Sequence, residues 1–570
     1  MKRFRPGISF GDFVITDFMA RKSHGLEDKP VRDFRRGVLI WMVVFLAFGL
    51  LFIRLVSLQI ISGNRYRVLA DENRIRKVIL PAPRGRILDR NGRVLAENKA
   101  KEADVGGVKV PIWERQYPEG KFTSHVIGTV GEVAEDEVGL IKKEGGSYEV
   151  GGLIGRSGLE VQYEDKLRGK EGGVLEEVDN QGKMVRNLGQ VQPKAGQDLM
   201  TTVDTKLQRV AMGALAGEKG AVVASVPGTG EILTLLSSPG FDPNTLSAEY
   251  SVLSTQEDKP LFNRAIGGAY PPGSIFKMIT TTAALESGKV QADFSYQDQG
   301  IITVGVYKYT NWLFTKRGAV EGIIGFSRGL TRSTDTFFYR VGELTGAEEI
   351  GKWAQRFGLG GPTGIDLPGE VEGLVPSPDW KMKTKGESWY LGNTFLMAIG
   401  QDDVLATPIQ MNQMTNVLAT GGTKCKPHLT NNSPLRPPLN LRGGSERVIC
   451  EKIEISPSTL EIIKKGMVGA CSTGGTAYVF FDWNDNKDLP KVACKTGTAE
   501  YVAENGKMKT HGWLTAYAPA DDPKISITAV VEGGGEGSDV AAPIVRKMMA
   551  EYFNVADTYP YDKIPKGSGE

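Results

Sequence analysis

A serine and a lysine three residues apart stand out as a possible catalytic pair. Ser274 and Lys277, in Tyr270-Pro-Pro-Gly-Ser-Ile-Phe-Lys277, form the only Ser-x-x-Lys of the 570-residue chain. Pro and Gly interrupt the chain before Ser274 and a largely apolar run follows, which predicts a helix with Ser274 in its first turn. Residues three apart share a helix face, so the hydroxyl and the amine can meet. Their types fit a nucleophile and its general base.

Lysine can act as this base only in its neutral form. A serine hydroxyl is a weak nucleophile at neutral pH until a neighbouring group takes its proton. The pKa of Lys277 must therefore be lowered, either by burial or by a second cation nearby. The same tetrapeptide on a solvated helix surface would do no chemistry, so other residues have to decide between the two interpretations.

Two further motifs favour the catalytic interpretation of this pair. Ser333-Thr-Asp335 and Lys495-Thr-Gly-Thr498 follow it along the chain. Ser-x-x-Lys, Ser-Asp-Asn and Lys-Thr-Gly, in this order, are the signature of penicillin-binding proteins and class A β-lactamases. The candidate catalytic residues are Ser274, Lys277, Ser333, Asp335 and Lys495, and the candidate substrate-binding residues are Thr496, Gly497 and Thr498.

An α+β domain is expected to position these motifs. Strand patterns occur early, at 220–226 and 231–237 around a Pro-Gly-Thr-Gly turn, and late, at 491–498, 512–517 and 525–531. Helical patterns lie between and after them, at 326–344, 459–468 and 540–553. Strands at both ends with helices between them are typical of an antiparallel sheet flanked by helices. Ahead of this domain, 80–96 predicts a hairpin around Asn91-Gly92, and 97–200 a small extended module.

The N-terminal region predicts one membrane-spanning helix. Residues 37–53 carry no charge, and the apolar run resumes after Arg54 to residue 61. A helix over 37–61 is long enough to cross a bilayer, with Arg54 reaching the interface. No small-x-small cleavage site follows, so we expect an uncleaved signal anchor. The simplest layout is a single pass with residues 1–36 in the cytoplasm and the bulk of the chain outside it.

Composition and cysteine spacing exclude several function classes. With 40% hydrophobic residues, 24% charged residues and a net charge of +2, the chain is ordinary and globular, and its dispersed basic residues predict no nucleic-acid binding. The four cysteines (425, 450, 471 and 494) fit no zinc motif. No metal or cofactor is expected. The cysteines allow three complete pairings. Cys494 should point into the core, opposite to Lys495, and we expect it there as a free thiol.

The chain resembles class B penicillin-binding proteins, of the elongation-type PBP2 (MrdA) family, over residues 37–555. The resemblance rests on the three motifs and on further segments. In the first part of the chain these are 83–92 (Pro-Arg-Gly-Arg-Ile-Leu-Asp-Arg-Asn-Gly), 155–160 and 167–172; later they are 220–224, 241–244, Gly400-Gln401, 407–410, 474–477 and 541–543. It implies a cytoplasmic tail (1–36), a transmembrane helix (37–61), a dimerisation-type pedestal with a shortened head (62–200), a transpeptidase domain (201–555) and a C-terminal tail (556–570).

The resemblance also implies a reaction. Ser274 would attack the terminal D-Ala-D-Ala of a peptidoglycan stem peptide, and an amine of a neighbouring stem would resolve the acyl-enzyme into a cross-link during cell-wall elongation. Lys277 would be the base, Lys495 a second cation, Ser333 a proton relay, and Thr496 and Thr498 hydroxyls for the substrate carboxylate. The implied place is the outer side of a bacterial inner membrane. Implied partners are lipid II-derived glycan strands, β-lactam inhibitors, a SEDS-type glycosyltransferase and other elongation proteins.

Departures from the family pattern leave alternatives open. Asp335 stands where Asn is frequent, Asp402 replaces a usual Gly, and only about 28 residues replace a head subdomain of roughly a hundred between Ala96 and His125. A D-Ala-D-Ala carboxypeptidase or a β-lactamase would use the same trio with water as the acceptor, although neither needs a pedestal and an anchor. A non-catalytic sensor or scaffold that binds β-lactams or muropeptides is the alternative outside the enzymes.

Overall fold

The computed structural model describes residues 32–105, 108–143, 148, 150–179, 181, 183–430, 449–503 and 506–564. The chain divides into two compact units, one formed by Met1–Val78 with Leu175–Gly189, and the other by Ile79–Val174 with Gln190–Glu570. The expected tail at 1–36 lies almost entirely outside the described residues, as do the last six residues of the chain.

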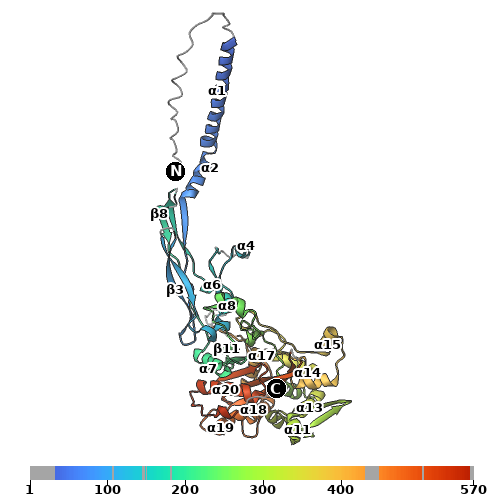
Figure 1. The fold of residues 1–570 in the computed structure, drawn as a ribbon. Helices are drawn as coiled ribbons and strands as arrows, with labels where there is room; N and C mark the ends of the chain where they lie inside the picture. The colour runs from blue at the N-terminus through green and yellow to red at the C-terminus, as the bar shows by residue number, and fades with distance from the viewer. Residues whose placement is uncertain are drawn as a thin grey trace, which may run out of the picture. The chain divides into compact units, whose positions relative to one another are not determined.

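The first unit contains the apolar N-terminal helix. Helix α1 (Arg32–Val56) continues through a π-helical turn (Ser57–Ile61) and is followed by α2 (Gly63–Arg74) (Figure 1). The stretch Arg36–Ile61 is long and apolar enough to cross a membrane, and none of its most apolar window is buried. This stretch matches the expected span to within one residue. A three-stranded sheet in the order β1-β7-β8 (Ile75–Leu80, Gly172–Val178 and Met184–Val191) belongs largely to this unit.

The second unit begins with paired β-strands. Strands β2 (Ile87–Leu88) and β3 (Val94–Val105) pair antiparallel around Asn91-Gly92, which confirms the hairpin expected there. Strand β3 also pairs along its length with β4 (Val108–Gln116), and β9 (Leu199–Met200) lies beside β2. The long β3–β4 hairpin occupies most of the short segment between Ala96 and His125.

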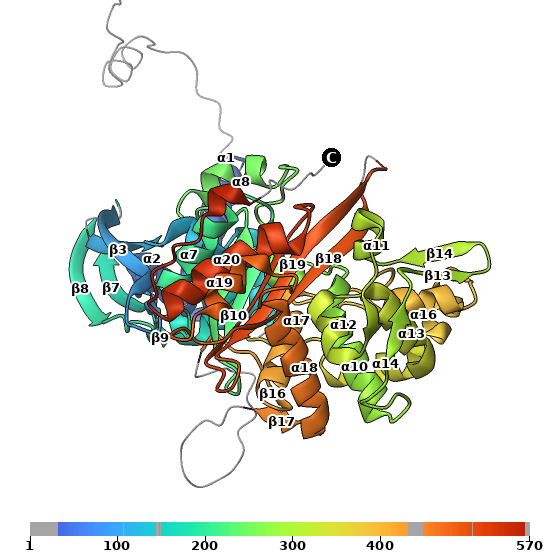
Figure 2. The same ribbon diagram turned by 90° about the horizontal axis from the view of Figure 1, so that it is seen from below.

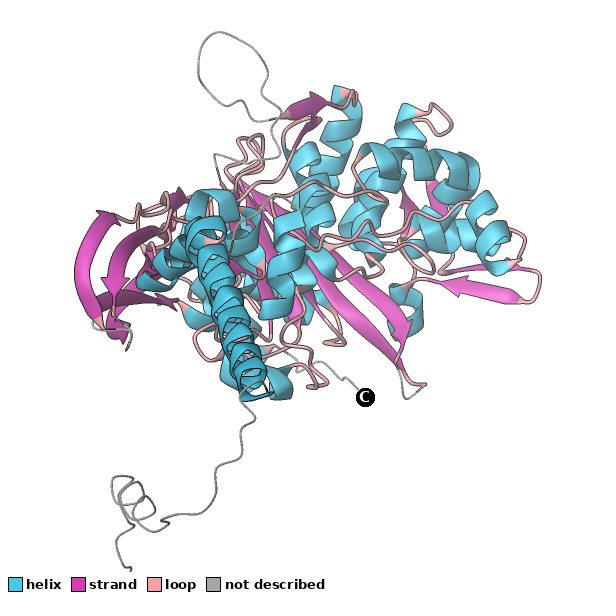
Figure 3. Cartoon of the chain, turned by 90° about the horizontal axis from the view of Figure 1, so that it is seen from above, coloured by secondary structure: helices cyan, strands magenta, loops and turns pink. Residues whose placement is uncertain are grey.

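A five-stranded antiparallel sheet lies at the centre of the second unit. Its order is β11-β10-β20-β19-β18, with bounds Ile232–Ser238, Gly220–Ser225, Ile525–Val531, Met508–Ala518 and Ala493–Val502. Helices α7 (Thr205–Leu215) and α20 (Gly537–Tyr552) cover one face, and α17 (Pro408–Ala419) and α18 (Pro457–Ala470) the other (Figures 2 and 3). Both faces are buried because alternate residues enter two cores: Val222 lies in the core that includes residues of α20, and Val223 in the core that includes residues of α17. The expected α+β architecture is confirmed.

The helix expected over 326–344 is two helices. Helix α12 (Phe326–Arg332) ends at Ser333, which takes a left-handed φ of +55°, and α13 (Asp335–Thr345) starts afresh. Helical periodicity continues across the break, so the sequence pattern does not reveal it. Ser333 O accepts a hydrogen bond from Lys277 Nζ at 2.8 Å. This contact with a distant residue helps to stabilise the left-handed backbone conformation at the break.

The cysteines form two disulfides, Cys425–Cys450 and Cys471–Cys494. The expected free thiol at Cys494 is therefore wrong, although its position in the core is right: Cys494 is buried on the α20 side of the sheet. Strand alternation predicts the face that a side chain occupies but not its neighbours. Cys471 arrives from the end of α18, a connection that only the tertiary fold makes.

Candidate active site

Ser274 lies in a tight turn against the edge strand of the sheet. A 3₁₀ turn, Gly273–Phe276, precedes α10 (Lys277–Glu286), so Ser274 stands just before the α-helix. Gly273 has φ +57°, and a Cβ there would lie 2.8 Å from the Thr498 carbonyl oxygen of β18. Only glycine allows both the conformation and the close approach. Gly273 N–H also donates to Gly400 O at 2.8 Å, which fixes the turn from its other side.

Lys277 is fully buried and makes three hydrogen bonds to the α12–α13 junction. Its Nζ donates to Ser333 O at 2.8 Å, to Ser333 Oγ at 3.2 Å and to Asp335 Oδ1 at 2.6 Å. Within the described residues the half-buried Ser274 hydroxyl makes no hydrogen bond, so the expected meeting with Lys277 is not made in this state. Catalytic hydrogen bonds often tighten only when substrate binds.

Lys495 approaches the same junction from strand β18. Its side chain is fully buried, and Nζ donates to Ser333 Oγ at 2.8 Å and to Thr496 O at 3.0 Å. The Ser333 hydroxyl therefore lies between two lysine amines. The structure thus brings Lys277, Ser333, Asp335 and Lys495 into direct contact from three distant segments, with Ser274 at the head of the helix that carries Lys277.

Burial lowers the pKa of both lysines. For Lys277, loss of hydration lowers the pKa and outweighs Asp335, whose charge and hydrogen bond raise it. For Lys495, loss of hydration and then the neighbouring Lys277 charge hold the pKa well below its ordinary value. The neutral form of either amine is therefore easier to reach than that of an exposed lysine.

The substrate-binding candidates on β18 have different neighbours. Thr496 Oγ1 lies 2.8 Å from Thr476 Oγ1, and Thr498 Oγ1 lies 3.4 Å from Glu536 Oε2. A Cβ on Gly497 would meet Pro272 O at 3.0 Å, so a side chain there would press on the Ser274 turn. All three residues border the turn or the lysine cluster.

Sequence reasoning assigned no role to three polar neighbours of β18: Gln401, Thr476 and Glu536. Gln401 Nε2 donates to Thr498 O and its Oε1 accepts from Glu500 N–H, each at 3.2 Å, which ties the loop that carries Gln401 to the edge strand β18. The sequence signal available for two of these residues was that Gly400-Gln401 and the segment around Thr476 belong to the family pattern. Asp402, which replaces a usual Gly, has a φ of +63°. Glycine is favoured in this left-handed conformation, but Asp is tolerated there.

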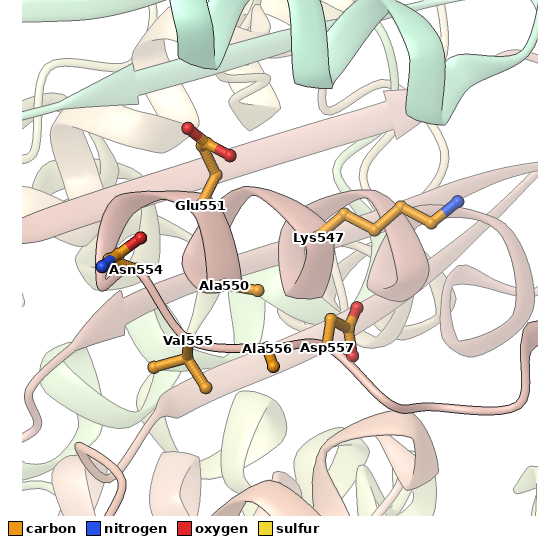
Figure 4. A pocket seen from close by; sticks show the side chains of 7 residues that line it. All are labelled: Lys547, Ala550, Glu551, Asn554, Val555, Ala556 and Asp557. Atoms are coloured by element: carbon orange, nitrogen blue, oxygen red, sulfur yellow. The ribbon is translucent and has the colours of Figure 1, made fainter.

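His511 lies outside the lysine cluster. It pairs with Ala499 across the β18–β19 ladder, whereas Lys495 pairs with Thr515. Its ring stacks on Tyr501 at 4.0 Å, and burial lowers its pKa to about 4. These contacts place His511 in the packing of the sheet. A pocket at the end of α20, lined by Lys547, Ala550, Glu551 and residues 554–557 (Figure 4), includes none of the candidate site residues.

Comparisons with known proteins agree with this geometry. Residues 220–550 match the penicillin binding protein transpeptidase domain, and residues 100–201 the penicillin-binding protein dimerisation domain. The chain is 31% identical to the peptidoglycan D,D-transpeptidase MrdA of Acinetobacter baumannii, over 90% of this chain and 88% of that protein. It is 30% identical to the Escherichia coli K12 protein of the same name, over 89% and 92%.

Solved structures show the same relationship. A Pseudomonas aeruginosa PBP2 in complex with WCK 5153 superposes with a TM-score of 0.69 at 31% identity, covering 84% of this chain and 96% of that one. A Helicobacter pylori PBP2 in complex with MreC superposes with a TM-score of 0.70 at 25% identity, covering 84% and 99%. The chain therefore belongs to the penicillin-binding transpeptidases, in the MrdA family of serine-type peptidoglycan D,D-transpeptidases.

Proposed function

We propose that Ser274 is the acylated nucleophile of this transpeptidase and that the cluster of Lys277, Ser333 and Lys495 moves its proton. Ser274 Oγ forms an ester with the carbonyl carbon of the penultimate D-Ala, the amide bond to the terminal D-Ala breaks, and free D-Ala leaves. An amine of a second stem peptide then attacks the ester, which releases Ser274 and leaves a new amide cross-link. Protons and bonds balance in both steps, and no cofactor enters.

The observation that carries the proposal is the Ser333 hydroxyl between two buried amines. Neutral Lys277 takes the proton from Ser274 as the new bond forms. Ser333, which accepts hydrogen bonds from both amines, can pass a proton on to the departing nitrogen. Asp335 orients Lys277 through its 2.6 Å bond and partly opposes the effect of burial on the lysine pKa.

Strand β18 supplies the proposed binding groups. Lys495 and the hydroxyls of Thr496 and Thr498 offer positive charge and donors for the terminal carboxylate of the substrate. Backbone N–H groups of Ser274 and Thr498 would stabilise the oxyanion, each contributing about 3–4 kcal/mol by analogy with other acyl-transfer enzymes. The lack of a side chain on Gly273 supports this pairing, because it lets the serine turn lie against Thr498.

Placement and partners extend the same proposal. Residues 37–61 would anchor the protein in the inner membrane, 62–200 would form the pedestal, and 201–555 would act on the periplasmic side. β-Lactams would acylate Ser274 as inhibitors. The relatives solved as a complex with MreC, and as a peptidoglycan synthase complex that coordinates polymerization and crosslinking, support a glycosyltransferase of the SEDS type and elongation proteins as partners.

Fluorescent penicillin followed by mass spectrometry tests the nucleophile. We expect one adduct on Ser274, none in Ser274→Ala, and normal labelling in Ser287→Ala, a matched change at the other end of α10. An adduct that persists in Ser274→Ala would refute the assignment. Incubation with lipid II, a glycan polymerase and an acceptor stem then separates the alternatives: cross-linked dimers are expected, whereas D-Ala release without dimers would indicate a carboxypeptidase.

A further inference from the structure

The Thr498 hydroxyl, a proposed ligand of the substrate carboxylate, already faces a carboxylate of the protein itself. Thr498 Oγ1 lies 3.4 Å from Glu536 Oε2 and accepts a long hydrogen bond of 3.5 Å from Gly537 N–H. Glu536 stands directly before α20, on the segment that joins it to β20. A hydroxyl has one proton to donate, so Thr498 cannot serve Glu536 and a substrate at once.

Lys316 holds Glu536 in this position from a distant element. Lys316, at the end of α11 (Trp312–Arg317), pairs with Glu536 Oε1 at 2.5 Å, while the other oxygen faces Thr498. The two side chains are about half exposed, at 55% and 44%. The pair therefore links α11 to the start of α20. Figure 2 shows α11 beside β18, the strand that carries the binding groups.

We propose that Glu536 is a specificity-determining residue: an internal carboxylate that occupies the Thr498 position until the carboxylate of a substrate displaces it. The inference rests on the proposed role of Thr498 in substrate binding. The contact to Thr498 is long and therefore weak, so a ligand that also gains Lys495 and Thr496 can replace it. Because the ion pair is exposed and screened by water, its removal should change the affinity for anionic ligands only moderately.

The test compares two probes on purified full-length protein. One is a fluorescent penicillin with its free carboxylate, and the other is its methyl ester, which lacks the charge. For each, stopped-flow fluorescence separates the apparent dissociation constant from the maximal acylation rate. In Glu536→Gln we expect the dissociation constant of the carboxylate probe to fall about two- to fivefold, with its maximal rate and both constants of the ester unchanged. Glu536→Ala should behave as Glu536→Gln does.

Controls keep the outcome decisive. Glu461→Gln removes a comparably exposed carboxylate, paired with Lys464 at 3.1 Å, and should change neither probe. A gain in affinity cannot arise from misfolding. The inference is overturned if Glu536→Gln leaves the carboxylate probe unchanged or weaker, if both probes improve equally, or if only Glu536→Ala has an effect. Acylation of Ser274 in the wild-type protein reports separately on the proposed function; its absence would refute both.

Discussion

Two buried clusters of charged side chains, one around Arg84 and one beside Ser274, differ in how their charges balance. In the first, Arg84 and Arg115 meet Glu160 and Glu164, so two cations face two anions. In the second, Asp335 pairs with Lys277 at 2.6 Å, and its charge raises the pKa of both Lys277 and Lys495. The first cluster is neutral as a whole when every group is ionised, and the second is not.

The chemistry of the cations follows this difference. Arg84 donates to Glu160 at 2.9 Å and to Glu164 at 2.8 Å; burial by itself lowers its pKa, but these partners raise it above its ordinary value. Arginine therefore stays charged and cross-links the chain. Lysine can lose its proton, and burial without enough anions lowers the pKa of Lys277. A balanced cluster stabilises the fold, whereas an unbalanced one can supply a base.

Lys277→Met should have the largest effect. Without the base, we expect the rate of penicillin acylation to fall about a thousandfold at neutral pH, because general-base catalysis contributes effects of this size. Stopped-flow labelling measures the rate, and near-UV circular dichroism checks the fold. Lys289→Met, just beyond the end of α10, is the matched control and should acylate normally. A Lys277→Met rate within about tenfold of wild type would mean that this lysine is structural, as Arg84 is.

Arg84→Met should be the most damaging change to stability. It leaves Glu160, which is fully buried, and Glu164 short of a cation, and breaking a buried pair costs about 3–5 kcal/mol. Urea unfolding followed by fluorescence measures the loss. Protein that remains folded should still acylate at the normal rate, because the lysine cluster is untouched. A stable Arg84→Met variant with slow acylation would contradict the division of roles.

Asp335→Asn sharpens the comparison by removing the one anion of the lysine cluster. Asp335 raises the pKa of Lys277, so its neutralisation should lower that pKa further. Acylation needs the neutral amine, so its rate rises with pH through this pKa, and the acid limb of the pH–rate profile should move to lower pH. Asn can keep a hydrogen bond to Lys277, so activity should persist. A limb that stays in place, or moves to higher pH, would show that another group controls it.

Arg86→Met should have the smallest effect. Arg86 pairs with Asp198 at 2.6 Å, but the two side chains are 54% and 41% exposed. Exposed ion pairs contribute less than about 1 kcal/mol to the free energy of unfolding. Urea unfolding of Arg86→Met should therefore differ little from that of wild type, although Arg86 is only two residues from Arg84. A loss as large as that of Arg84→Met would mean that burial is not what distinguishes the Arg84 cluster.

The sequence predicted much of the fold where local patterns suffice. Alternation and turn residues located β10, β11, β19 and β20 and the hairpin around Asn91-Gly92, and the apolar run located the membrane-type helix to within one residue. The sequence did not reveal the break between α12 and α13, because neither Ser333 nor Thr334 is a Pro or Gly, the residues that usually mark the end of a helix. The left-handed conformation of Ser333 is instead accompanied by a hydrogen bond from Lys277, 56 residues away.

By itself, the sequence determined the reactive groups: three short motifs specify which hydroxyls and amines are available, because motif chemistry is local. Only the tertiary structure decided their state. Whether Lys277 or Asp335 dominates the lysine pKa depends on burial, which no local pattern measures. The disulfide partner of Cys494 and the contact of Glu536 with Thr498 likewise depend on segments that meet only in the folded chain. Hydration and proximity are properties of the packed molecule, and they turn a serine and a lysine three residues apart into a candidate acylation site.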